Sequence, residues 1–326
     1  MTRATEGVAA GARVLPPIEI EPPDLAPWRE GNTGIPYVWR FESARPGPQV
    51  TIQALTHGNE VCGAICNDWL LREGVRPVRG TLTLTFANVD AYLAFDRSDP
   101  FASRCVDEDF NRLWSSDVLD GPRQSRDLAR ARALRPVYDA TDYLLDLHSM
   151  TDPCPPLALA GQQQKGLELA QAIGVPQHIV IDAGHAAGKR LRDYGPFDDP
   201  TDPRNALLVE CGQHWERAAP EVARQAALRF LRHFGLVDAA FLDAHLDPAP
   251  PRQRAIEVTD VVTIASDDFA FVQPVAGLTV IPEGGSVLAR DGEREILTPY
   301  DDAVLIMPTR KPRKGETAVR IGRFVA

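Results

Sequence analysis

Four residues have the chemistry of a hydrolytic metal site. His57 and Glu60 follow the strand-like run VTIQAL at residues 50–55, and their spacing at the start of a helix would place both side chains on one face of its first turn. His148 follows the apolar run YLLDL, and Glu210 ends the run ALLVE. Two imidazoles and one carboxylate are the three protein ligands of a hydrolytic zinc site, and a further carboxylate can act as its general base. Together these residues indicate a metal site that activates water.

Three more polar residues come after the β-rich run TLTLTFA at residues 81–87. They are Arg104, Asn111 and Arg112. Ligands of α/β sheets usually lie outside the carboxyl ends of the strands. We therefore expect these side chains near the same edge of the sheet as the two histidines and the two glutamates.

Each residue also has a structural interpretation. A histidine beside a strand end is commonly a loop or capping side chain, and Glu60 could simply favour the dipole at a helix N-terminus. Glu210 could pair with an arginine, and Arg112 could form a surface salt bridge. Asp146 lies two residues before His148 and points to the same side of the strand, where it either supports the histidine or serves the structure alone. The combination of these residue types, in this order and each at a predicted strand end, favours the functional interpretation.

Strands and helices alternate in the sequence between residues 50 and 234. The predicted strands are 50–55, 81–87, 143–147, 178–181 and 206–210, and the predicted helices are 60–73, 125–139, 162–173 and 221–234. This alternation predicts an α/β fold with a parallel or mixed sheet flanked by helices.

The pattern changes after His245. The run DPAPPRQR is rich in proline and polar, which is typical of a domain boundary. Beyond it the sequence predicts short strands at 255–264, 269–272, 277–281 and 303–307, and no helix. We therefore expect a catalytic domain at residues 1–246, whose residues 1–45 form an extended arm with some strand content, and a small all-β domain at residues 247–326.

The composition argues against several kinds of partner. The 326 residues carry 45 acidic and 35 basic side chains, a formal net charge of −10, so neither nucleic acid nor an anionic membrane surface is expected as a partner. No run approaches the ~18 apolar residues of a membrane helix, and the N-terminus lacks the apolar core of a signal peptide. The five cysteines have no CxxC spacing, so we expect reduced thiols in a cytoplasmic protein.

Four short motifs occur in a fixed order along the chain. They are HGNE at 57–60, R-x6-N-R at 104–112, DLH at 146–148 and VExG at 209–212. This set resembles the aspartoacylase and succinylglutamate desuccinylase family, which belongs to the zinc carboxypeptidase superfamily. The segment TPYDDAVLIMP resembles the C-terminal domain of bacterial members, whereas residues 1–45 add nothing to the resemblance.

The resemblance implies a zinc-carboxypeptidase-like fold and a role for each motif residue. It assigns one zinc ion per chain to the ligands His57, Glu60 and His148. By the same resemblance Glu210 is the catalytic base and Arg104 polarises the scissile carbonyl. Asn111 and Arg112 then hold the substrate carboxylate, for which the planar fork of an arginine is well suited.

We therefore expect a zinc-dependent amidohydrolase that removes an acyl group from an N-acyl amino acid or a similar small amide with a carboxylate. The alternatives are a zinc carboxypeptidase, which needs the same zinc, base and carboxylate clamp, and a non-catalytic metal- or small-molecule-binding protein. The appended β domain favours the deacylase, because in the family this part narrows the substrate channel. The acyl group, the amino acid and any homo-oligomer stay open, as do the roles of Arg192, Arg204, His214 and Tyr300.

Overall fold

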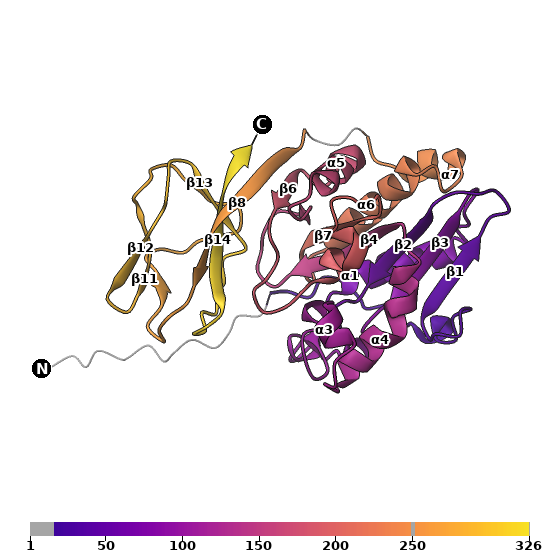
Figure 1. Ribbon diagram of the computed structural model, residues 1–326, viewed down its shortest axis with the longest axis horizontal. Coiled ribbons are helices and arrows are strands. Elements are labelled where there is room, and N and C mark those ends of the chain that lie inside the picture. Colours follow the sequence, from indigo (N-terminus) through magenta and orange to yellow (C-terminus); the bar gives the residue numbers. More distant parts are fainter. Residues whose placement is uncertain (1–15, 249–251, 326) are drawn as a thin grey trace, which may run out of the picture.

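One 11-stranded sheet runs through the molecule (Figure 1). The computed structural model describes residues 16–248 and 252–325. In spatial order the strands of the sheet are β1 (Val38–Glu42), β3 (Thr81–Phe86), β2 (Gln49–Ala54), β4 (Tyr143–Met150), β7 (Asn205–Gln213), β5 (Leu157–Leu159), β6 (His178–Ile181), β8 (Arg254–Thr263), β14 (Thr317–Val325), β13 (Ala303–Ile306) and β10 (Val280–Ile281). A second, three-stranded sheet has the order β12 (Arg294–Leu297), β11 (Val287–Asp291), β9 (Ala270–Phe271).

The central strands are parallel and buried. β2 pairs in parallel with both β3 and β4, and β4 pairs in parallel with β7. Nearly every residue of these strands is buried, including the threonines that alternate with leucine in β3, because both faces of the sheet are covered. Parallel strands place their carboxyl ends at one edge of the sheet, so residues that follow β2 lie close to the ends of β4 and β7.

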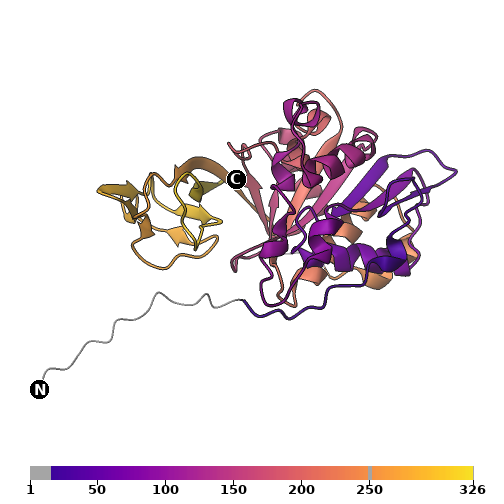
Figure 2. The ribbon, with the colours of Figure 1, turned by 90° about the horizontal axis from the view of Figure 1, so that it is seen from below.

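Helices cover both faces of this part of the sheet (Figure 2). On one face, α1 (Val61–Arg72), α5 (Gln164–Ile173) and α6 (Ala219–His233) enclose a core that includes Leu145 and Leu147 of β4. On the other face, α4 (Arg126–Asp139) packs in a separate cluster with Leu144. Side chains alternate along a strand, so Asp146 and His148 lie on the same face as Leu144. The face covered by α4 is therefore the one that carries the candidate site.

Shorter helices complete the architecture. They are α2 (Val89–Leu93), α3 (Ser116–Leu119) and α7 (Ala239–His245), with 3-10 turns η1 (Ala26–Trp28), η2 (Ala102–Arg104), η3 (Phe110–Arg112), η4 (Leu191–Asp193) and η5 (Gly195–Phe197). The α/β fold class with a mixed sheet is confirmed, and the long predicted helices agree with the structure to within a few residues. The sequence did not predict α2, α3, α7, β5, β11, β12 or β14.

The C-terminal strands continue the central sheet. Residues 252–325 contain strands and no helix, in agreement with the predicted all-β character. β8 pairs in parallel with β6, with His178 opposite Arg254, and β14 pairs antiparallel with β8. The sheet therefore extends from the N-terminal part of the chain into the C-terminal part (Figure 1). The division into domains at residue 247 stays a prediction.

The N-terminal segment packs along the outside of the α/β part. Residues 1–15 of the predicted arm lie outside the described residues, and β1 begins within the last part of the arm. The backbone N–H of Glu19 donates to the carbonyl of Trp215 at 3.0 Å, and the hydroxyl of Tyr92 donates to the carbonyl of Pro23 at 2.5 Å. Within residues 16–248 and 252–325, no helix combines the length and apolar character needed to cross a bilayer.

Candidate metal centre and active site

A tight turn between β2 and α1 brings His57 and Glu60 together. Glu60 is the N-cap of α1 rather than part of its first turn, so the two side chains converge through the turn and not through the helical spacing that the sequence suggested. The backbone N–H of Glu60 donates to the carbonyl of His57 at 3.2 Å, and Nδ1 of His57 lies 2.6 Å from Oε1 of Glu60. A Cβ at Gly58 would lie 2.4 Å from the backbone of Ala91 and Tyr92, so glycine is required for this close approach.

His148 and Glu210 lie side by side on neighbouring strands. They are direct partners in the parallel pairing of β4 with β7, which places both side chains on one face. Both strands continue beyond these residues, to Met150 and Gln213, so His148 and Glu210 lie inside the strands and not at their ends as predicted.

Three buried side chains converge tightly enough to hold one ion. Nδ1 of His148 lies 2.8 Å from Oε2 of Glu60, and Nδ1 of His57 approaches the other oxygen of the same carboxylate. One ligand atom from each of His57, Glu60 and His148 lies within 4.8 Å of the other two. These are the three residues to which the sequence resemblance assigns the zinc ion.

A carboxylate also lies behind each imidazole. Oδ2 of Asp146 is 2.9 Å from Nε2 of His148, and Oδ1 of Asp109 is 2.9 Å from Nε2 of His57. The other oxygen of Asp146 accepts hydrogen bonds from Gln53 and Thr56. A carboxylate at Nε2 favours the tautomer with the proton on that nitrogen and leaves Nδ1 free to ligate a metal. Asp146 thus has the supporting position considered from the sequence, whereas the role of Asp109 was not predicted.

The electrostatics of these residues suit a divalent cation. Burial raises the pKa of Glu60, but His57 and His148 outweigh it and hold the pKa of this carboxyl well below its usual range. Burial lowers the pKa of His148, yet the carboxylates of Asp146 and Glu60 raise it well above the usual value. Each oxygen of the buried Glu60 carboxylate faces one imidazole nitrogen, Oε1 that of His57 and Oε2 that of His148. A buried carboxylate between two imidazole nitrogens has the chemistry of a zinc donor set.

Glu210 has the properties of a general base. It is buried, and within residues 16–248 and 252–325 its Oε2 has no hydrogen-bond partner. Burial raises the pKa of Glu210 to about 8, although His148 acts in the opposite direction. A carboxyl group that titrates near neutral pH, beside a cluster of metal-ligating groups, matches the requirement for proton transfer at that pH.

Arg104 reaches the metal-ligand cluster through the turn that follows β2. The backbone N–H of Gly58 donates to the carbonyl of Arg104 at 3.0 Å, which fixes the arginine beside that turn. Nη2 of Arg104 lies 3.0 Å from Nε2 of His57 and donates to Asp109 at 3.0 Å, and Nη1 lies 3.7 Å from Glu60. Arg104 therefore places its guanidinium beside His57 and Glu60.

Asn111 and Arg112 follow in a 3-10 turn that Asp109 caps. The carboxylate of Asp109 accepts the N–H of Asn111, and Oδ1 of Asn111 accepts the N–H of Leu191 at 2.9 Å. Arg112 donates to the carbonyl of Asn111 and lies 3.9 Å from Asp109. The cavity lined by all seven predicted site residues has a volume of about 310 Å³. It contains His57, Glu60, Arg104, Asn111, Arg112, His148 and Glu210.

The residues left open by the sequence lie elsewhere. Arg192 is buried and donates to Asp193 and to a backbone carbonyl, Arg204 pairs with Asp202, and the hydroxyl of Tyr300 is 2.6 Å from that of Thr259. His214 is buried against Ser149 at 2.9 Å. None of these four lines the cavity. Four residues with no sequence signal do line it, namely Asp182, His185, Arg190 and Arg320.

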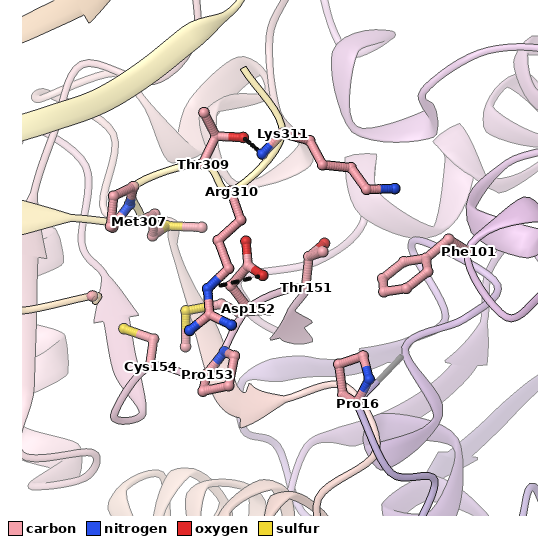
Figure 3. A pocket seen from close by; sticks show the side chains of 13 residues that line it. Pro16, Phe101, Thr151, Asp152, Pro153, Cys154, Met307, Thr309, Arg310 and Lys311 are labelled. Carbon is pink, nitrogen blue, oxygen red and sulfur yellow. Dashed lines mark hydrogen bonds and ion pairs between the residues drawn. The ribbon is translucent and has the colours of Figure 1, made fainter. Parts of the chain in front are cut away.

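A larger cavity adjoins the first one (Figure 3). It has a volume of about 520 Å³ and shares Met150, Thr151 and Met307 with the smaller cavity. Its wall includes Phe101 from the N-terminal part and residues 307–311 from the C-terminal part, and Arg310 lies across it, 3.6 Å from Asp152. The smaller cavity thus adjoins a wider space lined by both parts of the chain.

A buried His-Glu-His set with a further carboxylate beside it is a donor set of the kind that hydrolytic metal sites use. Comparison with known proteins identifies the family. Residues 46–233 match the sequence model of the succinylglutamate desuccinylase/aspartoacylase catalytic domain. The chain belongs to this family, whose members are hydrolases of acylated amino acids.

Solved structures share the fold over most of the chain. A succinylglutamate desuccinylase from Vibrio parahaemolyticus has a TM-score of 0.68 at 18% identity, with 89% of this chain and 87% of that chain covered. A succinylglutamate desuccinylase/aspartoacylase from Rhodobacter sphaeroides has a TM-score of 0.63 at 16% identity, covering 89% of each chain. A product-bound ectoine utilization protein from Ruegeria pomeroyi has a TM-score of 0.64 at 15% identity, covering 88% of each chain. A search of curated proteins gave no match.

Proposed function

We propose that this chain is a zinc-dependent hydrolase that removes an acyl group from an N-acyl amino acid or a related small amide. The observation that carries the proposal is that one cavity of about 310 Å³ is lined by the three metal-ligating residues, the buried glutamate and the three polar residues of the R-x6-N-R motif. These groups come from four separate segments of the chain, so their convergence is a property of the fold and not of local sequence.

We propose one zinc ion per chain, held by His57, Glu60 and His148. An ion bound there would act as a Lewis acid and would lower the pKa of the water that attacks the amide. The Asp109 and Asp146 carboxylates orient the two imidazoles so that both Nδ1 atoms face Glu60.

The residues around the proposed ligands have separate roles in the reaction. Glu210 accepts a proton from the attacking water and passes it to the leaving amine, which its place beside His148 permits. Arg104 donates hydrogen bonds to the oxyanion that forms from the scissile carbonyl. Asn111 and Arg112 bind the carboxylate of the amino acid and fix the amide relative to Glu210.

We also propose that the protein works in the cytoplasm. All five cysteines are free thiols, and Cys62, Cys66 and Cys211 are buried. Burial raises the pKa of Cys66 and of Cys211, so these thiols stay protonated and unreactive. Free cysteines of this kind are typical of a reducing compartment.

The experiment is a turnover assay of the zinc-loaded protein. We expect amine release from a panel of N-acyl amino acids and little release of C-terminal residues from blocked dipeptides. His57→Ala should abolish turnover, whereas the matched variant His233→Ala, at the last residue of α6, should not. Preferential cleavage of the dipeptides would favour the carboxypeptidase alternative. Stoichiometric zinc without turnover of any compound would indicate a binding protein and would refute the proposal.

A further inference from the structure

A buried carboxylate, that of Asp127, holds the loop between η2 and η3. Asp127 lies in the first turn of α4 and is fully buried. Its Oδ2 accepts the backbone N–H of Asp107 at 2.6 Å and that of Glu108 at 3.1 Å. Its Oδ1 accepts the backbone N–H of Val106 at 3.3 Å and the side-chain amide N–H of Asn88 at 2.6 Å. Three consecutive backbone groups of the loop therefore bind one side chain.

The helix that carries Asp127 has a separate cap. Ser125 is the N-cap of α4, and its side chain accepts the backbone N–H of Leu128 at 2.9 Å. The donors that bind Asp127 all lie outside α4. Hydrogen bonds to an ionised acceptor are about twice as strong as neutral ones, and a buried carboxylate without donors would be costly. We therefore expect Asp127 to restrain the loop rather than the helix.

The restrained loop leads directly to Asp109. Oδ1 of Asp109 lies 2.9 Å from Nε2 of His57, and Oδ2 accepts a hydrogen bond from Nη2 of Arg104 at 3.0 Å. Asp109 immediately follows the residues whose N–H groups bind Asp127, so a shift of the loop would displace its carboxylate from both contacts. A carboxylate behind a ligating imidazole fixes the orientation of the ring and raises its basicity. The positions of His57 and Arg104 therefore depend on the loop.

A second connection joins Asp127 to the segment that precedes His57. Asn88 donates its side-chain amide to Asp127 and its backbone N–H to the carbonyl of Leu55, at 2.8 Å. Leu55 follows β2 and lies two residues before His57. Asp127 is thus linked to the chain on both sides of the contact between His57 and Asp109.

The same junction contains an exposed ion pair. Asp107 in the loop pairs with Arg126 of α4 at 2.6 Å, and Arg126 is exposed. Exposed pairs of this kind contribute little, because water screens them and two long side chains must be ordered. Asp107 therefore offers a control that removes a carboxylate from the same junction while Asp127 is kept.

We propose that Asp127 is a positioning residue for the reaction. It fixes Asp109 and, through Asp109, orients the imidazole of His57 and the guanidinium of Arg104. This inference rests on the proposed function and deepens it, because it assigns a part in the reaction to a residue that lies outside the motifs and does not line the catalytic cavity. A displacement of about 1 Å can cost about 100-fold in rate, so a loop shift too small to unfold the protein would be visible in its kinetics.

The experiment is a double-mutant cycle of Asp127→Asn and Asp109→Ala, in which zinc affinity is measured by competition with a chelator. An amide has one oxygen, so Asp127→Asn leaves part of the loop without an acceptor. We expect zinc binding to weaken by about 10-fold in Asp127→Asn and by about 10- to 100-fold in Asp109→Ala. The double variant should bind zinc at most about twofold more weakly than Asp109→Ala, because both changes act on one contact. Asp107→Asn should bind zinc like the wild type.

The same cycle in kcat, at saturating zinc, separates positioning from stability. Asp127→Asn should lower kcat by about 10- to 100-fold with a smaller change in KM, because the proposed role of Arg104 belongs to the transition state. In the Asp109→Ala background this loss should nearly disappear. An equal loss of kcat or of zinc affinity in both backgrounds would overturn the inference. A lower melting temperature with unchanged kcat and zinc affinity would also overturn it, because Asp127 would then serve the fold alone.

Asn88→Ala is a milder variant for the same cycle, in case Asp127→Asn does not fold. It removes one donor to Asp127, and the side chain of Asn88 forms no capping hydrogen bond with α2. We expect a smaller loss of zinc affinity than in Asp127→Asn, and this loss should disappear in the Asp109→Ala background. A loss that persists in that background would overturn the inference.

Zinc binding keeps this inference distinct from the proposed function, because it is measured without turnover. If no N-acyl amino acid is hydrolysed but the zinc affinities of the Asp127 and Asp109 variants are coupled, the proposed function fails and the positioning of Asp109 by Asp127 stands. If the amides are hydrolysed and the two changes act independently on zinc affinity, the role of Asp127 is refuted and the proposed function stands.

Discussion

Replacing Glu210 by glutamine is expected to shift the stability of the metal-free protein in favour of the variant as the pH rises, while it removes the proposed catalytic base. Glu210 is buried on β7, and burial raises its pKa to about 8 although His148 opposes the shift. The folded protein therefore holds this proton more tightly than the unfolded chain, in which the pKa of a glutamate is about 4.3. Because the folded state binds the extra proton between these two values, the free energy of unfolding falls as the pH rises through this window.

The size of the change in the free energy of unfolding follows from the interval between the pKa of Glu210 in the unfolded chain and its pKa in the folded protein. Each pH unit changes the free energy of unfolding by about 1.4 kcal/mol for one proton. Between about pH 5 and about pH 8, the wild type should lose up to about 4 kcal/mol that the variant retains. The cost of burying the amide of Gln is the same at both pH values and cancels in this comparison. We therefore expect the stability difference to shift by about 2–4 kcal/mol in favour of Glu210→Gln.

Urea denaturation in the presence of a chelator, at both pH values, measures this shift. The other titrating groups near the site are present in both proteins, so the difference reports Glu210 together with its coupling to His148 and Glu60. Glu293→Gln, at an exposed turn, is the control and should show no pH-dependent difference. With zinc bound, Glu210→Gln should keep its metal and lose at least ~100-fold in kcat. A stability difference that is the same at both pH values would refute the assignment of a raised pKa to a buried, unpaired Glu210.

Three further predictions concern the ligands and the arginines. His57→Ala should lose most of its zinc, as measured by metal analysis after dialysis, and full zinc content would contradict its role as a ligand. Asp146→Asn should weaken zinc binding by about 10- to 100-fold in a chelator competition, because the carboxylate behind His148 is lost, and an unchanged affinity would make Asp146 a purely structural residue. Arg104→Ala should lower kcat by about 100-fold or more, whereas Arg112→Ala should chiefly raise KM. Parallel losses of kcat and melting temperature in both arginine variants would show that they only stabilise the loop around Asp109.

The convergence of His57, Glu60 and His148 was predictable because its signals are local. HGNE places His57 and Glu60 within four residues, and apolar runs before His148 and Glu210 identify neighbouring parallel strands. The predicted backbone conformation at His57 and Glu60 was wrong. The sequence indicated a helical turn at His57 and Glu60, whereas the backbone makes a separate turn in which Glu60 caps the helix. Local spacing determined which residues meet, but not the conformation that brings them together.

The charged group of Asp182, His185, Arg190 and Arg320 at the cavity was not predictable because its members are distant in sequence. Arg320 lies 138 positions after Asp182, and nothing in the run TAVRIGRFV marks one of its two arginines as buried. That run alternates poorly between apolar and polar residues, which also explains why β14 was missed. The same reasoning applies to Asp109, whose role depends on the position of His57. Such residues become recognisable only when the pairing of β14 with β8 and β13 is known.

The parallel pairing of β8 with β6 also protects the molecule from aggregation. β6 is a short, largely apolar strand, HIVI, with β5 on one side and β8 on the other. A chain that ended near residue 248 would leave one side of β6 without hydrogen-bond partners. Unpaired strand edges of this kind recruit strands from other molecules, and apolar ones do so most readily. Such a fragment would retain His57, Glu60 and His148, yet we expect it to precipitate. The C-terminal strands should therefore contribute to colloidal stability as well as to the cavity.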